Sequence, residues 1–139
     1  MQSINRLLLL TTTLSILILI GAGEGKVIIG WLEIIAPFEF IKGYSKFSFT
    51  GTTDDKTFSI SLIALVGQII LFVACLNKRQ SIKFKLVYIG LFISIFSFLI
   101  LTVDFSNFND YIFWSGVPFL ISAIFLLIMT IKTNIQALH

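Results

Sequence analysis

The side chains that most often carry catalysis are scarce in this sequence. The only histidine, His139, is the last of 139 residues, and the only cysteine, Cys75, lies within an apolar run. These positions argue against a zinc site built on histidine, a bis-histidine haem and His-based acid–base catalysis within this chain. One cysteine allows neither an internal disulfide nor a redox pair. We therefore expect no enzyme activity, no cofactor and no metal site.

Two further sequence patterns lack residues that a ligand-binding site would need. Asp54 and Asp55 precede an apolar run, where negative charge suits the positive end of a helix dipole. Calcium binding would need more oxygen ligands at regular spacing than this segment carries. The GAGEGK segment, residues 21–26, lacks the spacing of a phosphate-binding loop and the Ser or Thr that follows its lysine.

Gln68 is the only strongly polar side chain near the middle of a long apolar run. Its amide needs hydrogen-bond partners in apolar surroundings, and we expect them in Ser94 and Ser97 on the next apolar run. One interpretation is that these side chains stabilise a contact between helices. The alternative is that they contact a solute or an ion. We favour the helix contact, because intramembrane function usually involves ionisable residues and the predicted spans below contain none.

The composition places these residues in a membrane. The chain is 57% hydrophobic and 12% charged, with a mean hydropathy of +1.01, whereas soluble domains carry about 25% charged residues. One core in a chain of this length could not bury so much apolar surface, and lipid is the simpler solvent. Since no linker-like run divides the sequence, we predict a single membrane domain over residues 1–139.

Four apolar runs are long enough to cross a bilayer as helices. They cover residues 7–23, 58–76, 86–103 and 112–131. The first resembles a signal peptide, with small residues at 21–23 as a cleavage site, but we expect it to be retained as a helix. Small and polar residues recur along one side of each run. This pattern predicts an all-α membrane protein, an antiparallel four-helix transmembrane bundle with those sides inward.

The charges on the connecting segments set the orientation. Segment 77–85, NKRQSIKFK, holds four bases and no acid, and a basic loop between spans stays on the cytoplasmic side. Both termini are then cytoplasmic. All seven acids lie outside with four bases, and the other six bases lie inside with no acid. We predict a multi-pass protein of the cell membrane that contacts the lipid bilayer and binds no nucleic acid.

Residues 24–57 form the sizeable loop outside the predicted membrane. Its apolar piece, residues 27–36, is too short to span, and Pro37 should end any helix there. Beyond Pro37, apolar and polar residues alternate on both sides of a turn at 43–45, which predicts a small extracytoplasmic β-hairpin between the first two spans. An irregular aromatic loop is the alternative. Our candidate partner-binding residues in this loop are Trp31, Phe38, Phe40, Tyr44, Phe47 and Phe49.

The layout resembles that of claudin-like membrane proteins, with four helices, both ends inside and a large first outer loop of β character. The segment Gly30-Trp31-Leu32 resembles the Trp-containing loop signature of that family, although the paired loop cysteines are missing here. The chain is also similar to small uncharacterised bacterial four-span membrane proteins. The shared features are one arginine in a polar start, a basic middle loop at 76–79, and a Gly-and-acid turn before the second span. This similarity implies no particular activity.

Together these features predict a non-catalytic integral membrane protein. We expect an accessory or scaffold subunit that binds a partner protein, or a second copy of itself, through its outer loop. One alternative is a small channel or transporter for a neutral or hydrophobic solute, with Gln68 and the serines lining its path. Another is protection against a membrane-directed toxin, to which no residue points specifically.

Overall fold

The computed structural model describes residues 2–22, 25–44, 46–48, 53–104, 107–108 and 110–136. Within these residues the chain forms five helices and two short antiparallel hairpins. The helices are α1 (Gln2–Ile16), α2 (Ile29–Lys42), α3 (Thr53–Leu76), α4 (Gln80–Thr102) and α5 (Asp110–Gln136). The strands are β1 (Leu19–Ala22) paired with β2 (Gly25–Ile28), and β3 (Val103–Asp104) paired with β4 (Asn107–Phe108).

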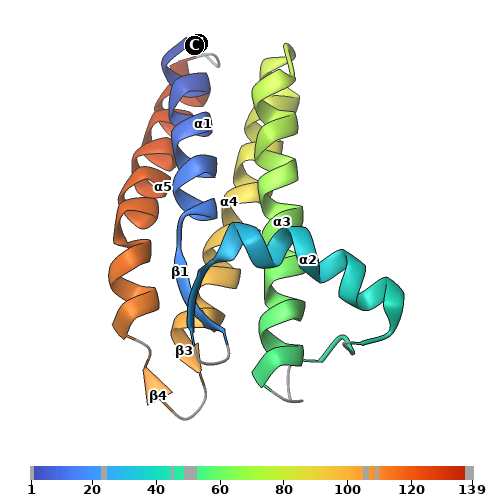
Figure 1. Cartoon of the computed structure of the whole chain (residues 1–139). Coiled ribbons are helices and arrows are strands. Elements are labelled where there is room, and N and C mark those ends of the chain that lie inside the picture. The colour runs from blue at the N-terminus through green and yellow to red at the C-terminus, as the bar shows by residue number, and fades with distance from the viewer. Residues whose placement is uncertain are drawn as a thin grey trace.

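Three helices are long and apolar enough to cross a membrane, namely Asp55–Leu76, Gln80–Thr102 and Ile112–Gln136. They contain most or all of the second, third and fourth predicted spans, and each helix extends beyond its span at one end or both. These helices stand beside α1 as a bundle, and the connection between α3 and α4 lies at the same end as the start of α1 (Figure 1). The prediction of a helical bundle is therefore confirmed, and three of its helices are suited to cross a membrane.

The first predicted span is not a continuous helix. α1 has 15 residues, which reach only about 22 Å, short of the roughly 30 Å of a hydrocarbon core. After Ile18 the chain becomes extended, and β1 carries it onward toward the far end of the bundle (Figure 1). The expectation of a helix to Gly23 was therefore wrong. The sequence ILILIGAG at 16–23 combines β-branched residues with glycines, which lowers its helix propensity.

The β-hairpin lies earlier in the chain than predicted. Leu19 pairs with Ile28, and Ala22 pairs with Gly25. The first of the two predicted strands, which begins at Phe38, is instead the second half of α2. Residues 46–48 of the second form no strand, and its remainder lies outside the described residues, so that prediction was wrong. α2 continues through Pro37, although a proline within a helix removes the backbone bond to the carbonyl four residues earlier and its ring crowds that carbonyl. Burial of the inner side of α2 offsets this loss.

α2 leaves the bundle sideways, across α3 (Figure 1). It ends at Gly43, whose φ of 73° lies in the left-handed region that glycine adopts without a steric penalty. The Gly43 N–H donates to the carbonyl of Phe40 at 3.1 Å, and the Tyr44 N–H donates to the carbonyl of Glu39 at 3.0 Å. These two bonds form a Schellman motif, which defines where the helix stops.

Small residues bring α3 and α4 close together. A Cβ added to Gly90 would lie 2.8 Å from two side-chain carbons of Leu71 and 3.1 Å from the carbonyl oxygen of Gly67. Ser94 and Ser97 follow Gly90 on the same side of α4, and both are buried. The prediction that the small and polar side of this helix faces inward is confirmed. On the other side of the bundle, the hydroxyls of Thr11 on α1 and Ser122 on α5 are 2.6 Å apart.

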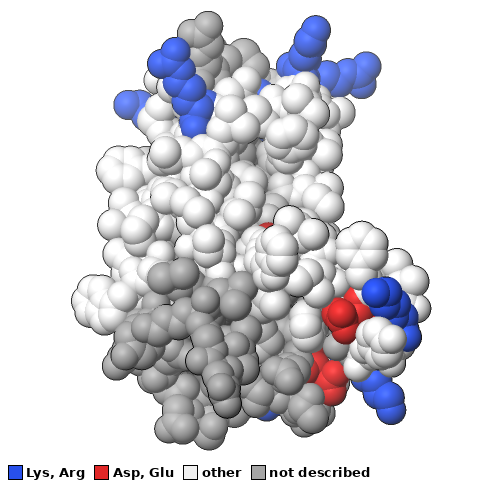
Figure 2. All heavy atoms as spheres, in the orientation of Figure 1, with Lys and Arg blue, Asp and Glu red and all other residues white. Residues whose placement is uncertain are grey.

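The charged side chains are unevenly distributed along the bundle. Figure 2 shows lysine and arginine side chains at the end where α3 joins α4, and no acidic side chain is visible at that end. The exposed bases of this end come from α1, the α3–α4 connection, α4 and α5: Arg6, Lys78, Arg79, Lys85 and Lys132. The molecule therefore has one basic end, as the positions of its charges along the sequence predicted.

Candidate functional site

α2 has two different sides. Its buried side chains include Leu32, Glu33 and Ala36, whereas Trp31, Ile34, Phe38 and Ile41 are exposed. This alternation follows the 3.6-residue period of the helix, which places residues three and four apart on one side. The buried side packs mainly against α3. α2 is thus anchored along one side and presents large apolar side chains on the other.

A buried polar pair anchors α2 to α3. The amide Nε2 of Gln68 donates a hydrogen bond of 2.7 Å to the carboxyl Oε1 of Glu33. The exposed fractions of these side chains are only 2% for Glu33 and 6% for Gln68. The predicted bonding of Gln68 to Ser94 or Ser97 was therefore wrong. The carboxyl oxygen of Glu33 accepts the amide N–H in place of a serine hydroxyl, which gives both buried side chains a hydrogen-bond partner.

The two serines have separate roles. Ser97 Oγ donates to the carbonyl of Ile93 on its own helix at 2.9 Å. Ser94 Oγ is buried and makes no hydrogen bond to any other described residue. Ser94 and Gln68 do line the same enclosed cavity, together with Ser15 of α1, and its volume is about 10 Å³. A cavity of this size is at the lower limit for a single water molecule.

Burial changes the acidity of Glu33. Desolvation raises the pKa of its carboxyl from 4.5 to about 7, and the hydrogen bond from Gln68 acts in the opposite direction. α2 lies outside the three helices that are long enough to span a membrane. The folded protein therefore keeps the proton of this carboxyl group to a higher pH than the unfolded chain does.

Glu33 was not among the predicted site residues, because the apolar piece around it is too short to span a membrane. A signal was present, since Glu33 is the only charged residue between Val27 and Phe38. A single carboxylate within a strongly apolar segment indicates a buried, paired group. The predicted spans contain no ionisable residue, but Glu33 from the predicted outer loop packs into the bundle beside Gln68.

The structure brings together only some of the aromatic residues that were predicted to bind a partner. Trp31, Phe38, Tyr44 and Phe47 are exposed, and Phe49 lies outside the described residues. Phe40 is half-buried, and its ring centroid lies 6.1 Å from that of Phe47. The contact means that the segment following α2 folds back toward the helix.

Polar contacts hold the segment after α2 against the start of α3. The Lys46 N–H donates to Asp55 Oδ1 at 3.0 Å, and the Ser48 N–H donates to Ser59 Oγ at 2.9 Å. The far end of α2 also carries Glu39 and Lys42. The exposed apolar side of α2 is therefore bordered by polar and charged groups at this end.

A second buried ionic group lies near the basic end of the bundle. Lys83 Nζ donates to Asn5 Oδ1 at 2.7 Å and thereby joins α4 to α1. The prediction that Lys83 belongs to an exposed loop over 77–85 was wrong, because α4 already begins at Gln80. No group of three or more His, Cys, Asp or Glu side chains in the described part of the chain could hold a metal ion.

Comparisons with known proteins add no functional assignment. No protein-family model, curated protein or solved structure matches this chain. The resemblances to claudin-like proteins and to small bacterial four-span proteins therefore stay predictions, and the function has to be argued from the anchored helix α2 and its surroundings.

Proposed function

We propose that this chain is a non-catalytic integral membrane protein that binds a partner membrane protein through the exposed side of α2, as an accessory or scaffold subunit. The observation that supports this is the position of α2. It leaves the bundle sideways instead of running along it (Figure 1). Its buried side is anchored by the Glu33–Gln68 hydrogen bond, and its other side is uncovered.

The composition of this exposed side suits a protein contact. Trp31, Ile34 and Phe38 form an apolar, partly aromatic surface, and Glu39 and Lys42 border it. Interfaces between proteins commonly have an aromatic-rich apolar centre and a polar rim. Contiguous exposed apolar surface rimmed by polar residues also marks interaction sites. A transmembrane helix of another protein would pack against this surface through van der Waals contacts.

The buried pair explains why the surface has one orientation. A carboxyl group in apolar surroundings is costly unless it has a hydrogen-bond partner. Rotation of α2 about its axis would separate Glu33 from Gln68, so the pair favours one rotational position. In that position Trp31 and Ile34 face away from α3. The hydrogen bond contributes specificity of orientation more than net stability.

We further propose four membrane crossings, with α1 and β1 together supplying the first. α1 is too short to cross alone, and β1 continues in the same direction (Figure 1). Because non-helical backbone at membrane depth must be covered by protein, the packing of α1 and β1 against α5 supports this arrangement. The basic end would face the cytoplasm of the cell, with both termini on that side.

Site-specific photo-crosslinking tests the partner surface. A photoreactive amino acid is placed at Ile34 or Phe38 in α2, and at Phe92 in α4 or Phe125 in α5 as controls that are equally exposed. The α2 positions should yield a discrete protein adduct, and the controls only lipid adducts. An adduct of twice the chain mass would identify a second copy as the partner. If all four positions give lipid adducts alone, the proposal is wrong.

A second candidate is a transporter for a small neutral solute, and the interior polar groups favour it. Gln68, Ser94 and Ser15 line one enclosed cavity, and Glu33 bonds to Gln68 beside it. Ionisable side chains inside a membrane bundle are often part of a transport path. Glycerol flux into liposomes tests this candidate. Unchanged flux after Gln68→Leu would exclude it, and faster flux than in empty liposomes, lost in this variant, would support it.

A further inference from the structure

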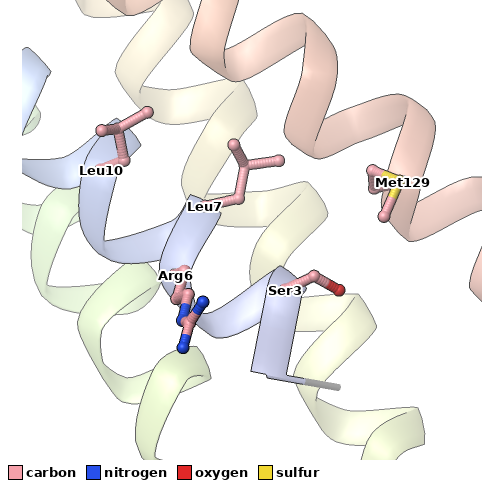
Figure 3. Close-up of a pocket in the computed structure, with 5 residues that line it drawn as sticks. All are labelled: Ser3, Arg6, Leu7, Leu10 and Met129. Atoms are coloured by element: carbon pink, nitrogen blue, oxygen red, sulfur yellow. The ribbon is translucent and has the colours of Figure 1, made fainter.

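A groove lies between α1 and α5, on a different part of the molecule from α2. Five side chains line it: Ser3, Arg6, Leu7, Leu10 and Met129. Its volume is about 590 Å³, and it is a shallow groove that is open along its length. In Figure 3, Ser3 and Leu7 point from α1 toward α5, from which Met129 points back.

The groove is polar at one end and apolar along its length. Its four α1 residues follow the spacing i, i+3, i+4, i+7, which places them on one side of that helix. Ser3 and Arg6 come first, near the start of α1, and Leu7 and Leu10 follow toward the middle of the bundle. A ligand that fits this order has an anionic head and an apolar tail.

The parts of α1 and α5 around the polar end carry basic side chains and no acidic ones. No Asp or Glu occurs in residues 2–16 or 111–136, which include all of α1 and nearly all of α5. Lys132 lies one turn beyond Met129 on α5, and it is exposed, as is Arg6. A guanidinium group can hold a phosphate through two parallel hydrogen bonds. The end of the groove is therefore complementary to a phosphate group.

We propose that this groove binds an anionic phospholipid of the leaflet at the basic end. The phosphate lies against the Arg6 guanidinium and the Ser3 hydroxyl, and one acyl chain lies along Leu7, Leu10 and Met129. Basic pockets between membrane helices are suited to anionic headgroups. A soluble phosphate would leave the apolar length of the groove unused. The site is independent of the proposed partner surface on α2, so either can be disproved alone.

Native mass spectrometry of the full-length protein in mild detergent tests the headgroup. The lipids are dioleoyl phosphatidylglycerol and, for comparison, dioleoyl phosphatidylcholine. The protein should retain phosphatidylglycerol preferentially, and Arg6→Gln should weaken this binding about fivefold. Arg79→Gln is the matched control, because Arg79 is exposed at the same end but does not line the groove. Equal losses in the two variants would indicate diffuse attraction and overturn the proposal.

Two further measurements test the acyl chain and do not depend on the Arg6 variant. Glycerophosphoglycerol, which has the headgroup without acyl chains, should not displace phosphatidylglycerol from the unmodified protein. Met129→Phe, which adds volume to the groove wall, should weaken lipid binding while leaving the helix content unchanged. Displacement by the free headgroup would reduce the groove to a phosphate site and overturn the proposal. Unchanged binding in a folded Met129→Phe protein would do the same.

Discussion

Gln68 on α3 donates a hydrogen bond of 2.7 Å to the carboxyl group of Glu33 on α2, and both side chains are buried. The two residues are 35 positions apart in the sequence. Their bond joins the helix that leaves the bundle to a helix that is long enough to span a membrane. The orientation of α2, and therefore the surface proposed to bind a partner, depends on this contact.

Removing the amide should destabilise the protein more than removing both partners. Gln68→Leu leaves a buried carboxyl group unpaired, and we expect a loss of about 1–3 kcal/mol in the free energy of unfolding. Adding Glu33→Leu to that variant should recover much of the loss. Denaturant unfolding in detergent, followed by circular dichroism, measures both effects. Gln136→Leu, at an exposed position, should change little. A double variant no more stable than Gln68→Leu would contradict the pairing.

Stability should fall as pH rises through the range in which Glu33 ionises. The folded-state pKa of about 7 lies above the ordinary value of 4.5, so the folded protein holds a proton that the unfolded chain has released. Its contribution, up to about 3 kcal/mol, is complete below pH 4.5 and is lost by about pH 7. Thermal unfolding at several pH values measures this dependence. Glu33→Gln should remove this part of the pH dependence, and an unchanged profile in that variant would contradict the assignment.

A methyl group at Gly90 should disrupt the contact between α3 and α4. Its Cβ would lie 2.8 Å from Leu71 side-chain carbons and 3.1 Å from a backbone oxygen, and the backbone cannot yield without separating the helices. We expect Gly90→Ala to cost about 1–3 kcal/mol in the free energy of unfolding. Ile89→Ala, at the exposed neighbouring position, is the control. Equal stability of the two variants would show that the helices pack less closely than described.

The bond between Lys83 and Asn5 should stabilise the attachment of α1 to α4. Asn5→Leu removes the acceptor that lies 2.7 Å from the buried Lys83 ammonium group. We expect a loss of about 1.5–3 kcal/mol, as for other hydrogen bonds to charged groups. Lys85→Met, which removes an exposed lysine from the same helix, should have a smaller effect. Proteolysis of the detergent-solubilised protein should also reach α1 sooner in Asn5→Leu, and equal digestion rates would contradict the predicted role.

Thiol labelling tests the orientation. In a Cys75→Ser background, Lys78→Cys places a thiol at the exposed α3–α4 connection, and Lys46→Cys places one after α2. A membrane-impermeant maleimide added to intact cells should label the Lys46 variant and not the Lys78 variant. Labelling of both after permeabilisation is the control. The reverse pattern in intact cells would show that the basic end faces outward.

Much of the architecture was predictable because it depends on local properties of the sequence. The length of an apolar run determines whether a helix can cross a membrane, and Asp55–Leu76 and Gln80–Thr102 contain nearly all of the second and third predicted spans. The inward-facing side of α4 could also be predicted, because Gly90, Ser94 and Ser97 recur at helical spacing. All three are buried in the structure. The basic end follows from the positions of lysine and arginine alone.

Only the tertiary structure decided how the described residues before α3 are arranged. A short apolar piece can be helix or strand, and packing against α3 selected helix for Ile29–Lys42 despite Pro37. Residues 19–22, expected to be helical, instead form β1 and pair with β2 from the predicted outer loop. The partner of Glu33 could not be read from spacing, because it lies on another helix. Burial between two helices, which no local pattern encodes, gave this carboxyl group its partner and its raised pKa.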